Sequence, residues 1–398
     1  MIKGGVAVTI TQENCMGCGL CAAECPKGAI SFTDENGFIL PVIDRSACVD
    51  CGKCVKVCKK DLKPVLSTRT KAFAAWSQDA AVRSASTSGG VAYEIAKHLL
   101  GEGYTYLGIE MDCAELKAKA YVTTDVAELG RSQGSKYIST WMYPAIAELK
   151  QKDKLLIIDV PCHIGAYDSW LKARGMRDKA ILVDMFCAGP CNSLVLKKQI
   201  QELCAREEKK QEDITSIGFR SKKKYGWGSN LAVAFRDGTE IQLKNSEADF
   251  FKLFYSDAFH SEACYRCEYD TNRSYADIRI GDYWGQKFAG NREGVSAVLA
   301  FTEAGEALVR ALIEKNVLQA EEVNAAGIYA GQLDKPQRKT RHYGKLQKEL
   351  QTEKSLKEIR AGVMKPVLRE RKIRAKAKRM LMATKLGFCK KIAKRIKK

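Results

Sequence analysis

Short apolar runs alternate with stretches of helical spacing through the middle of this 398-residue chain. Tyr104–Met111 and Leu155–Val160 are apolar runs of strand length, whereas Gly90–Leu100 and Ile164–Leu171 place apolar residues three and four positions apart. Strands interleaved with helices predict an α/β body over residues 66–330. Further strands are expected at Ile181–Phe186, Leu231–Phe235 and Val295–Phe301.

One part of this body is expected to be antiparallel. Strand-like sequence continues from Leu231 to Leu243 across Asp237-Gly238, a dipeptide typical of the tight turn in a β-hairpin. A hairpin at this position would interrupt the alternation of strands and helices on either side of it.

The first 65 residues follow another pattern, in which cysteines recur at fixed spacing. The run Cys15-x2-Cys18-x2-Cys21-x3-Cys25-Pro26 returns 33 residues later as Cys48-x2-Cys51-x2-Cys54-x3-Cys58, and the region ends at turn-prone Lys63-Pro64. Four thiolates are what a [4Fe–4S] cluster requires, and soft sulfur ligands select iron–sulfur clusters or zinc. The repeat therefore predicts an α+β ferredoxin-like domain with two clusters that carries electrons.

In two-cluster ferredoxins the fourth cysteine of each run binds the other cluster. We therefore expect one cluster on Cys15, Cys18, Cys21 and Cys58, and the other on Cys25, Cys48, Cys51 and Cys54. A pair of zinc sites is the alternative, but zinc sites usually combine two well-separated CxxC pairs. One departure from the ferredoxin pattern is Lys59, which stands where a second proline is expected.

Composition limits the class of protein. No run of eighteen apolar residues occurs, so we expect no transmembrane helix, and the N-terminal residues do not resemble a signal peptide. Sixteen cysteines, many of them in short repeats, indicate metal ligation in a reducing cytoplasm rather than disulfides.

The net charge of +19 belongs to the end of the chain. From Lys335 to Lys398 there are 24 Lys/Arg and 4 Asp/Glu, whereas the other 334 residues hold 42 basic and 43 acidic groups. Apolar residues from Ile373 to Ile396 recur near helical spacing, so residues 331–398 are expected to form a basic helical tail that contacts an anionic membrane surface. A solvated basic terminus is the alternative. Nucleic-acid binding is not expected, because Phe388 is the only aromatic residue from Arg371 to Lys398 that could stack on bases.

Several loops of the body carry candidate chemistry. Ser88-Gly89-Gly90 precedes a predicted helix, whose free amides could bind phosphate, although a plain helix cap is the simpler interpretation. Pro161-Cys162-His163 follows a predicted strand, where functional residues often lie. The basic loop Lys222–Trp227 could bind an anionic substrate or could be a solvated turn.

In order and spacing, the motifs of the body resemble the family of the coenzyme F-420 hydrogenase/dehydrogenase beta subunit. The resemblance covers residues 10–320 and leaves out the basic tail. It rests on Ser88-Gly89-Gly90, Gly134-Ser135-Lys136-Tyr137, Pro161-Cys162, Cys187, Cys264-x2-Cys267 and Gly281-Asp282-Tyr283-Trp284-Gly285.

The resemblance implies FAD in an α/β flavin-binding catalytic domain. Ser88, Gly89 and Gly90 would meet its phosphates, with Ser135, Lys136 and Tyr137 on its other side and Gly281 and Asp282 also in the cofactor site. Lys136 would stabilise anionic reduced flavin. His163 would be a catalytic donor or a structural loop histidine. Cys162, Cys187, Cys264 and Cys267 would hold a third [4Fe–4S] cluster or be inert buried thiols, with Cys191 competing for the place of Cys187.

The resulting expectation is a cytoplasmic FAD and iron–sulfur oxidoreductase, with its tail as a peripheral contact to the inner face of the membrane. Electrons would pass from ferredoxin or a similar donor through the clusters to FAD and a small organic substrate. Many relatives with this layout are linked to cell-surface polysaccharide synthesis. An oxidoreductase specific for the deazaflavin coenzyme F-420 is one alternative, and a non-catalytic electron-transfer subunit of a larger complex is the other.

Overall fold

The computed structural model describes residues 14–269, 272–332 and 339–362, followed by 364–367, 369 and 373. Of the amphipathic positions predicted in the tail, only Ile373 falls within these residues, so the predicted membrane helix lies outside the described part of the chain. Within that part, no helix combines the length and apolar character that a membrane span requires.

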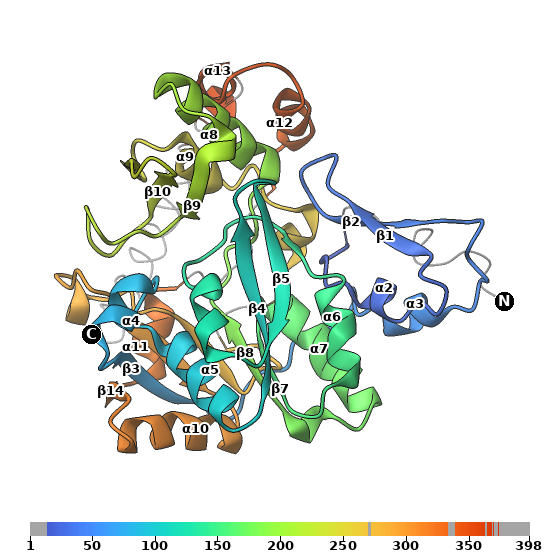
Figure 1. The fold of residues 1–398 in the computed structure, drawn as a ribbon, viewed down its shortest axis with the longest axis vertical. Coiled ribbons are helices and arrows are strands. Elements are labelled where there is room, and N and C mark those ends of the chain that lie inside the picture. Colours follow the sequence, from blue (N-terminus) through green and yellow to red (C-terminus); the bar gives the residue numbers. More distant parts are fainter. Residues whose placement is uncertain are drawn as a thin grey trace, which may run out of the picture.

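A mixed sheet of nine strands forms the centre of the molecule (Figure 1). The strand order across the sheet is β14-β3-β13-β12-β8-β7-β4-β5-β6. The strands are β3 (Lys71–Ser77), β4 (Thr105–Asp112), β5 (Lys117–Thr123), β6 (Thr140–Trp141), β7 (Leu155–Ile158), β8 (Ala180–Met185), β12 (Ile278–Asp282), β13 (Ser296–Ala300) and β14 (Leu318–Glu322).

Helices cover both faces of this sheet. Strand β7 is buried along its whole length: Leu156 and Ile158 pack with α5 (Val91–Gly101) and α10 (Glu303–Glu314), whereas Leu155 and Ile157 pack with α6 (Ala145–Glu148) and α7 (Pro161–Ala173). Alternate residues of a strand point to opposite faces, so this short apolar run can supply both cores at once.

Strands β4, β7, β8 and β12 run parallel to one another, and β3 runs in the same direction. Their carboxyl ends therefore meet at one edge of the sheet, and the loops that follow them lie together there. In open α/β sheets this edge is where ligands bind. The segments that leave β3, β7 and β8 at this edge carry Ser88, Cys162 and Cys187.

A second, smaller layer contains the predicted hairpin. The order β11-β10-β9 joins β9 (Ile214–Gly218), β10 (Asn230–Phe235) and β11 (Glu240–Lys244), all antiparallel. The turn between β10 and β11 closes with a hydrogen bond from the Phe235 amide to the Thr239 carbonyl, and Gly238 has a positive φ of 86°. The packed helices are α8 (Ser193–Arg206), α9 (Asp249–Phe254), α12 (Tyr343–Leu350) and α13 (Leu356–Gly362).

The placement of α12 and α13 corrects the tail boundary expected at residue 331. Leu346 and Leu356 are fully buried against the smaller layer, and Met364 and Val367 are 2% exposed. These apolar side chains make the start of the predicted tail part of the body's core. The high lysine and arginine content of the region concealed this, because charge says little about which residues of a helix face inward.

The N-terminal cysteine region is a small module beside α6 and α7 (Figure 1). It contains α2 (Leu20–Ala23), the antiparallel pair β1 (Ile30–Thr33) and β2 (Leu40–Ile43), and α3 (Lys53–Val57). Gly19 and Gly52 cap α2 and α3 in the left-handed conformation, with φ near 79° and 70°. Leu20 is completely buried with Ile146 and Trp170, so the module packs firmly on the body.

The strands and helices predicted from hydrophobic pattern are confirmed, with small shifts at their ends. Helix α7 differs most, because it begins at Pro161, three residues before the predicted start at Ile164. Proline is favourable in the first turn of a helix, where its missing N–H has no partner to lose. Several helices were not predicted, among them the long helices α8 (Ser193–Arg206) and α10 and the short helices α4 (Ala80–Ala85) and α11 (Ala325–Ala330).

Candidate functional site

The structure brings Cys15, Cys18, Cys21 and Cys58 together, and we call them the first quartet. Burial raises the pKa of Cys15 to about 11 and that of Cys21 to about 12, and the neighbouring thiol of Cys58 adds to both shifts. Buried, crowded thiols disfavour the thiolate unless positive charge is nearby. The irons of a cluster would provide that charge.

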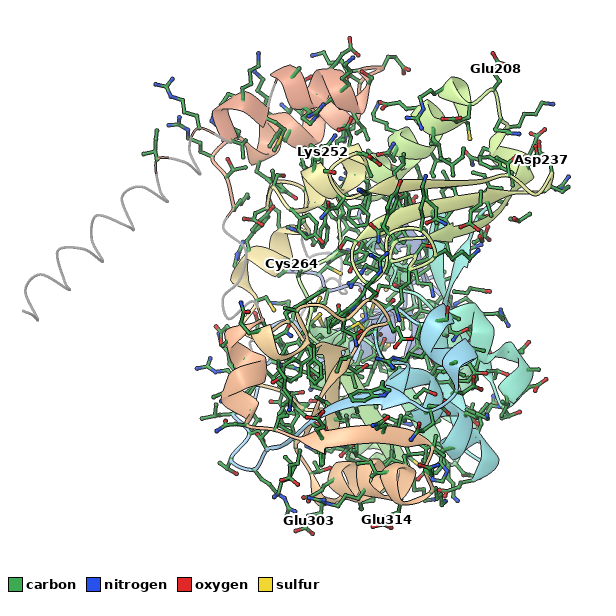
Figure 2. The ribbon with its side chains drawn as sticks, turned by 90° about the vertical axis from the view of Figure 1, so that its left-hand side faces the viewer. Glu208, Asp237, Lys252, Cys264, Glu303 and Glu314 are labelled. Carbon is green, nitrogen blue, oxygen red and sulfur yellow. The ribbon has the colours of Figure 1, made fainter. Side chains whose placement is uncertain are left out.

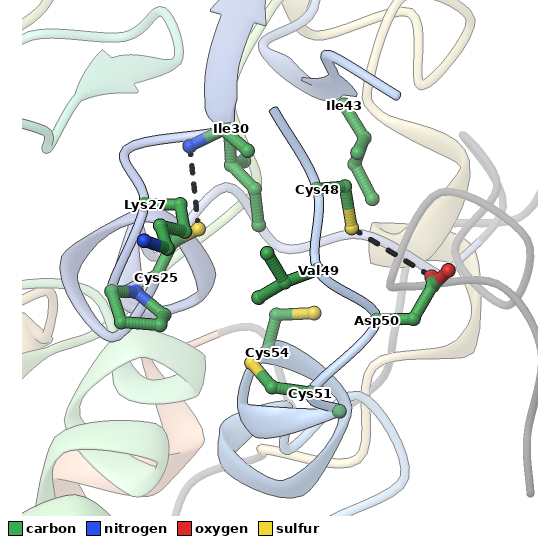
Figure 3. A pocket seen from close by; sticks show the side chains of 12 residues that line it. Cys25, Lys27, Ile30, Ile43, Cys48, Val49, Asp50, Cys51 and Cys54 are labelled. Atoms are coloured by element: carbon green, nitrogen blue, oxygen red, sulfur yellow. Dashed lines mark hydrogen bonds between the residues drawn. The ribbon is translucent and has the colours of Figure 1, made fainter. Parts of the chain in front are cut away.

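Cys25, Cys48, Cys51 and Cys54 line one small cavity at the other end of the module, shown in Figure 3, and form the second quartet. The Ala29 amide donates to the Cys25 sulfur at 3.3 Å, as backbone amides do to cluster ligands. Cys25 therefore lies with three cysteines of the second sequence run, and Cys58 lies with three cysteines of the first run. The exchange of fourth cysteines expected from the repeat is present in the geometry.

Four thiols of the body also converge. Burial raises the pKa of Cys162 strongly, and the thiols of Cys267, Cys187 and Cys264 raise it further. Figure 2 shows Cys264 between the smaller layer and the nine-stranded sheet. Gly189, with φ +86°, lets this loop approach, since a Cβ there would lie 3.1 Å from the Cys264 sulfur. We call Cys162, Cys187, Cys264 and Cys267 the central quartet.

Cys191 does not belong to this group. It is fully buried, its amide donates to the Tyr137 carbonyl at 2.7 Å, and burial with no neighbouring thiol raises its pKa. The competition between Cys187 and Cys191, open in the sequence, is therefore decided by position in favour of Cys187.

Zinc is the alternative to iron in these thiol quartets, and the sequence argument against it is that zinc sites usually combine two well-separated CxxC pairs. Among the described residues, no group of three or more His, Cys, Asp or Glu side chains is placed to hold a single metal ion.

A large cavity of about 1030 Å³ lies between the module, the carboxyl edge of the nine-stranded sheet and the smaller layer. It exceeds the usual range of small-molecule sites, and it includes the space among the central thiols. Cys15 of the first quartet also lines it. Residues predicted for the cofactor that line this cavity are Ser88, Gly90, Ser135, Lys136, Tyr137, Gly281 and Asp282.

His163 joins the body to the first quartet. Its Nδ1 lies 2.8 Å from Asp159 Oδ2, and its Nε2 lies 2.6 Å from the carbonyl oxygen of Met16. Both partners are acceptors, so both ring nitrogens donate and the ring is a cation. Burial alone would lower the pKa of His163, but the Asp159 carboxylate and the Met16 carbonyl together raise it. Both ring nitrogens are thus engaged, as the alternative of a structural histidine expects, although His163 also lines the large cavity. Its role as a catalytic donor stays a prediction.

The same face of α7 makes two further contacts with the module. Tyr167 donates its hydroxyl to the Cys18 carbonyl at 3.0 Å, and Trp170 donates its indole N–H to Glu24 at 3.1 Å. His163, Tyr167 and Trp170 are spaced four and three residues apart, so they share one side of the helix. The sequence analysis did not identify Asp159 or Tyr167 as functional residues. Their one sequence signal is that each lies four residues from His163, which is one helical turn.

Lys136 is held by backbone. Its ammonium donates to the carbonyls of Ser132 at 3.0 Å and of Gln133 and Gly134 at 3.1 Å, and more weakly to Arg131 at 3.3 Å. Burial lowers its pKa to about 7. The ammonium thus closes the end of a turn in the wall of the cavity, and the catalytic role of Lys136 stays a prediction.

Tyr137 and Asp282 meet at an arginine that the sequence did not single out. Arg220 donates to the Tyr137 hydroxyl at 3.0 Å and to both Asp282 oxygens, at 3.0 and 3.2 Å. Asp282 also accepts from the Trp227 indole at 2.5 Å. Arg220 is 7% exposed and lines the cavity, so this wall carries a buried, fully engaged cation. Its only sequence signal was a position two residues after β9.

The Ser88-Gly89-Gly90 loop fits a phosphate-bearing cofactor in part. Gly90, Val91 and Ala92, at the start of the 11-residue helix α5, line the cavity, so a positive helix end faces it. Gly89 has another explanation, since a Cβ there would lie 2.3 Å from the Ala75 carbonyl. Ser88 donates to the Val295 carbonyl at 2.8 Å. The cavity and the helix end fit a dinucleotide, whereas Gly89 serves chain packing.

The basic loop after Arg220 divides into two parts. Lys222 donates to the carbonyls of Arg83 and Ser88, at 2.7 and 2.6 Å, and so fixes the loop beside the cavity. Lys223 and Lys224 are exposed. The simpler interpretation from sequence, a solvated basic turn, describes the two exposed lysines, while Lys222 is structural.

Three family models match successive parts of the chain. A 4Fe-4S dicluster domain matches residues 10–62. The coenzyme F420 hydrogenase/dehydrogenase beta subunit matches in two parts, its N-terminal model over residues 72–147 and its C-terminal model over residues 152–326. The last two together cover more than half of the chain.

Two known proteins are similar over most of their length. A subunit of the F(420)H(2) dehydrogenase of Methanosarcina mazei is 24% identical over 324 residues, which span 76% of this chain and 83% of the relative. A chain of the F420-reducing [NiFe] hydrogenase complex from Methanosarcina barkeri superposes with a TM-score of 0.44 and 18% identity, covering 65% of this chain and 82% of that one.

Proposed function

Because this chain belongs to the family of the coenzyme F420 hydrogenase/dehydrogenase beta subunit and carries a 4Fe-4S dicluster domain, we propose that it is an iron–sulfur oxidoreductase subunit that acts on a deazaflavin coenzyme. It would exchange electrons between that coenzyme, in the large cavity, and a partner protein. The observation that carries the proposal is the cavity itself, which is lined both by the central quartet and by Cys15 of the first quartet.

The geometry supports an ordered path for electrons. The second quartet lies at one end of the module, and the first quartet lies against α7. His163 contacts the loop of the first quartet through the Met16 carbonyl, and its neighbour in sequence, Cys162, belongs to the central quartet. The first and central quartets are therefore linked through two adjacent residues. The order would be second, first, central quartet and then the cavity, or the reverse.

FAD is the cofactor that the family resemblance implies, and bound FAD would convert between a hydride from the coenzyme and single electrons for the clusters. In this proposal Gly90 and the start of α5 lie beside its phosphates, and Ser135 and Tyr137 line the opposite wall. Arg220 and Asp282 hold the Tyr137 hydroxyl in place. Lys136 stiffens the turn that carries Ser135.

The relatives favour one of the alternatives raised from sequence. The curated relative is named as a subunit of a dehydrogenase for F(420)H(2), which supports the deazaflavin coenzyme and a protein complex. No comparison bears on a ferredoxin-dependent reaction in cell-surface polysaccharide synthesis. The substrate proposed here is therefore the deazaflavin rather than a sugar-linked compound.

Anaerobic purification followed by a coenzyme assay tests the proposal. We expect about twelve irons per chain, bound flavin, and reduction of a viologen dye by reduced coenzyme F420. Arg220→Lys should slow this reaction, because lysine cannot donate to Tyr137 and Asp282 in the same forked geometry. Lys223→Ala, in the exposed part of the basic loop, is the matched control. Fully loaded protein that reacts with NADH and ignores the deazaflavin would contradict the proposal.

A further inference from the structure

Tyr269 carries a buried hydroxyl that has no hydrogen-bond partner among the described residues. Burying a hydroxyl without a hydrogen bond is unfavourable, so most buried hydroxyls in folded proteins have a partner. The nearby Tyr275 shows the ordinary arrangement, since its hydroxyl donates to the Lys63 carbonyl at 2.6 Å. The hydroxyl of Tyr269 therefore needs a separate explanation.

This hydroxyl lies beside the central quartet. Tyr269 follows Cys267 by two residues, and its side chain lines the same cavity as the four central thiols. Burial contributes most to raising the pKa of the hydroxyl, and among the thiols Cys162 and then Cys267 raise it further. The hydroxyl therefore keeps its proton and can donate a hydrogen bond to a sulfur acceptor.

Helix α7 leaves room for the hydroxyl at Gly165. This glycine stands three positions after Cys162, so the two residues lie on the same side of the helix. A Cβ at Gly165 would overlap the Tyr269 hydroxyl oxygen and would lie 3.1 Å from the ring carbon that bears it. Glycine is unfavourable inside a helix, so its presence here has a specific reason. It lets the hydroxyl approach α7 beside Cys162.

From these observations we propose that the Tyr269 hydroxyl donates a hydrogen bond to a sulfur of the cluster held by the central quartet, and that this bond raises the reduction potential of that cluster. Reduction adds one negative charge to the cluster, so a donor aimed at one of its sulfurs stabilises the reduced state more than the oxidised state. The proton stays on the tyrosine oxygen throughout. This inference rests on the proposed function only in taking the central quartet as a cluster.

An anaerobic redox titration of full-length, iron-loaded protein, followed by electron paramagnetic resonance, tests this inference. The signal of the central cluster is identified as the one that Cys187→Ser removes. Tyr269→Phe keeps the ring and removes only the hydroxyl, so at a fixed ambient potential the ratio of reduced to oxidised central cluster should fall about fivefold. Tyr275→Phe removes a hydroxyl that is bonded to the backbone, and as the matched control it should leave the ratio unchanged.

Two further measurements separate the hydrogen bond from a change in packing. Gly165→Ala crowds the hydroxyl and should also lower the ratio, and adding it to Tyr269→Phe should lower the ratio no further, because both changes remove the same bond. Electron–nuclear double resonance in light and heavy water detects exchangeable protons near a cluster. Tyr269→Phe should lose one such coupling to the central cluster, whereas Tyr275→Phe should keep it.

The possible failures can be told apart. Full iron content with an unchanged central potential in Tyr269→Phe would overturn the inference. A variant whose only defect is a raised KM for the deazaflavin would also overturn it, because the hydroxyl would then serve the cavity. About eight irons per chain in the unchanged protein would overturn the central cluster and this inference together. The titration contains no deazaflavin, so a wrong coenzyme assignment would leave its result unaffected.

Discussion

The imidazole of His163 donates to the main-chain carbonyl of Met16 across the boundary between the body and the cysteine module, with 2.6 Å between Nε2 and oxygen. Met16 lies between Cys15 and Cys18, and His163 follows Cys162. One hydrogen bond therefore connects a loop of the first quartet to a helix that begins at the central quartet. Its charge is offset by Asp159, which is 1% exposed.

Removing this imidazole should loosen the module and change its electrochemistry. His163→Ala leaves the Asp159 carboxylate buried without its cation, at a cost of about 3–5 kcal/mol in unfolding free energy. Urea unfolding of the iron-loaded protein under anaerobic conditions measures this cost. Adding Asp159→Asn should recover part of it, because the uncompensated charge is gone.

A purely structural role for His163 would leave the potentials alone, so potentials are the second readout. Loss of a cation next to Cys162 and beside the Cys15–Cys18 loop should lower the reduction potentials of both nearby clusters, since reduction adds negative charge. Redox titration followed by electron paramagnetic resonance measures them. Unchanged potentials in a folded variant would limit His163 to a packing role.

The exchange of fourth cysteines makes a specific prediction for paired substitutions. Cys25→Ser should perturb the same cluster signal as Cys48→Ser, and Cys58→Ser the same signal as Cys15→Ser. Each should cost about four irons per chain or convert one cluster, because each cubane needs four thiolates. Iron analysis with electron paramagnetic resonance distinguishes the pairs. If Cys25→Ser affected the Cys15 signal instead, each sequence run would bind its own cluster.

The central quartet can be tested against the adjacent buried cysteine. Cys187→Ser should remove the third cluster, because its sulfur lies with Cys162 and Cys267. Cys191→Ser should keep the full iron content and lose only packing, since Cys191 faces the body's core. Anaerobic iron analysis of both variants tests the assignment. Equal iron loss in the two variants would contradict the exclusion of Cys191 from the cluster.

His260 gives the stability a dependence on pH. It is fully buried, its Nδ1 lies 3.3 Å from the Pro190 carbonyl and its Nε2 has no hydrogen-bond partner among the described residues. Burial lowers its pKa to about 4. The unfolded chain, with a histidine pKa of about 6.5, binds the extra proton first as pH falls. Stability is therefore retained above pH 6.5 and is lost between 6.5 and 4.

The loss at pH 5 should be about 2 kcal/mol relative to pH 7. His260→Phe removes this titration, so its unfolding free energy should fall less between the same two pH values. Urea titrations of both proteins at each pH provide the comparison. Parallel losses in the two proteins would assign the acid sensitivity to other groups, such as the cluster thiolates.

The membrane prediction for the tail is tested by a truncation that spares the core. Val367 is 2% exposed, so removing the whole predicted tail would damage the core, whereas a cut after Ile373 removes 11 Lys/Arg and no Asp/Glu. Each basic residue near an anionic leaflet contributes about 1 kcal/mol, so this truncation should abolish sedimentation with anionic liposomes. Viologen reduction should be unchanged, and equal sedimentation would leave the tail solvated.

The sequence by itself determined the parts whose chemistry is local. The spacing of Cys15, Cys18 and Cys21 places three thiols in one tight loop whatever surrounds it, and the apolar run at Leu155–Ile158 has a strand's length and composition. In a repeat of this kind, short sequence separation alone keeps the ligands close together. For the same reason, the strand and helix positions came close to those of the structure.

Only the tertiary structure decided which residues from distant segments share a site. It separated Cys187 from Cys191, four residues apart, because the strand-to-helix loop turns one thiol toward Cys264 and the other toward the core. It also enclosed Lys136 among carbonyls. Whether a polar side chain is free or engaged depends on what the rest of the chain packs around it, and hydrophobic periodicity and short motifs contain no record of those neighbours.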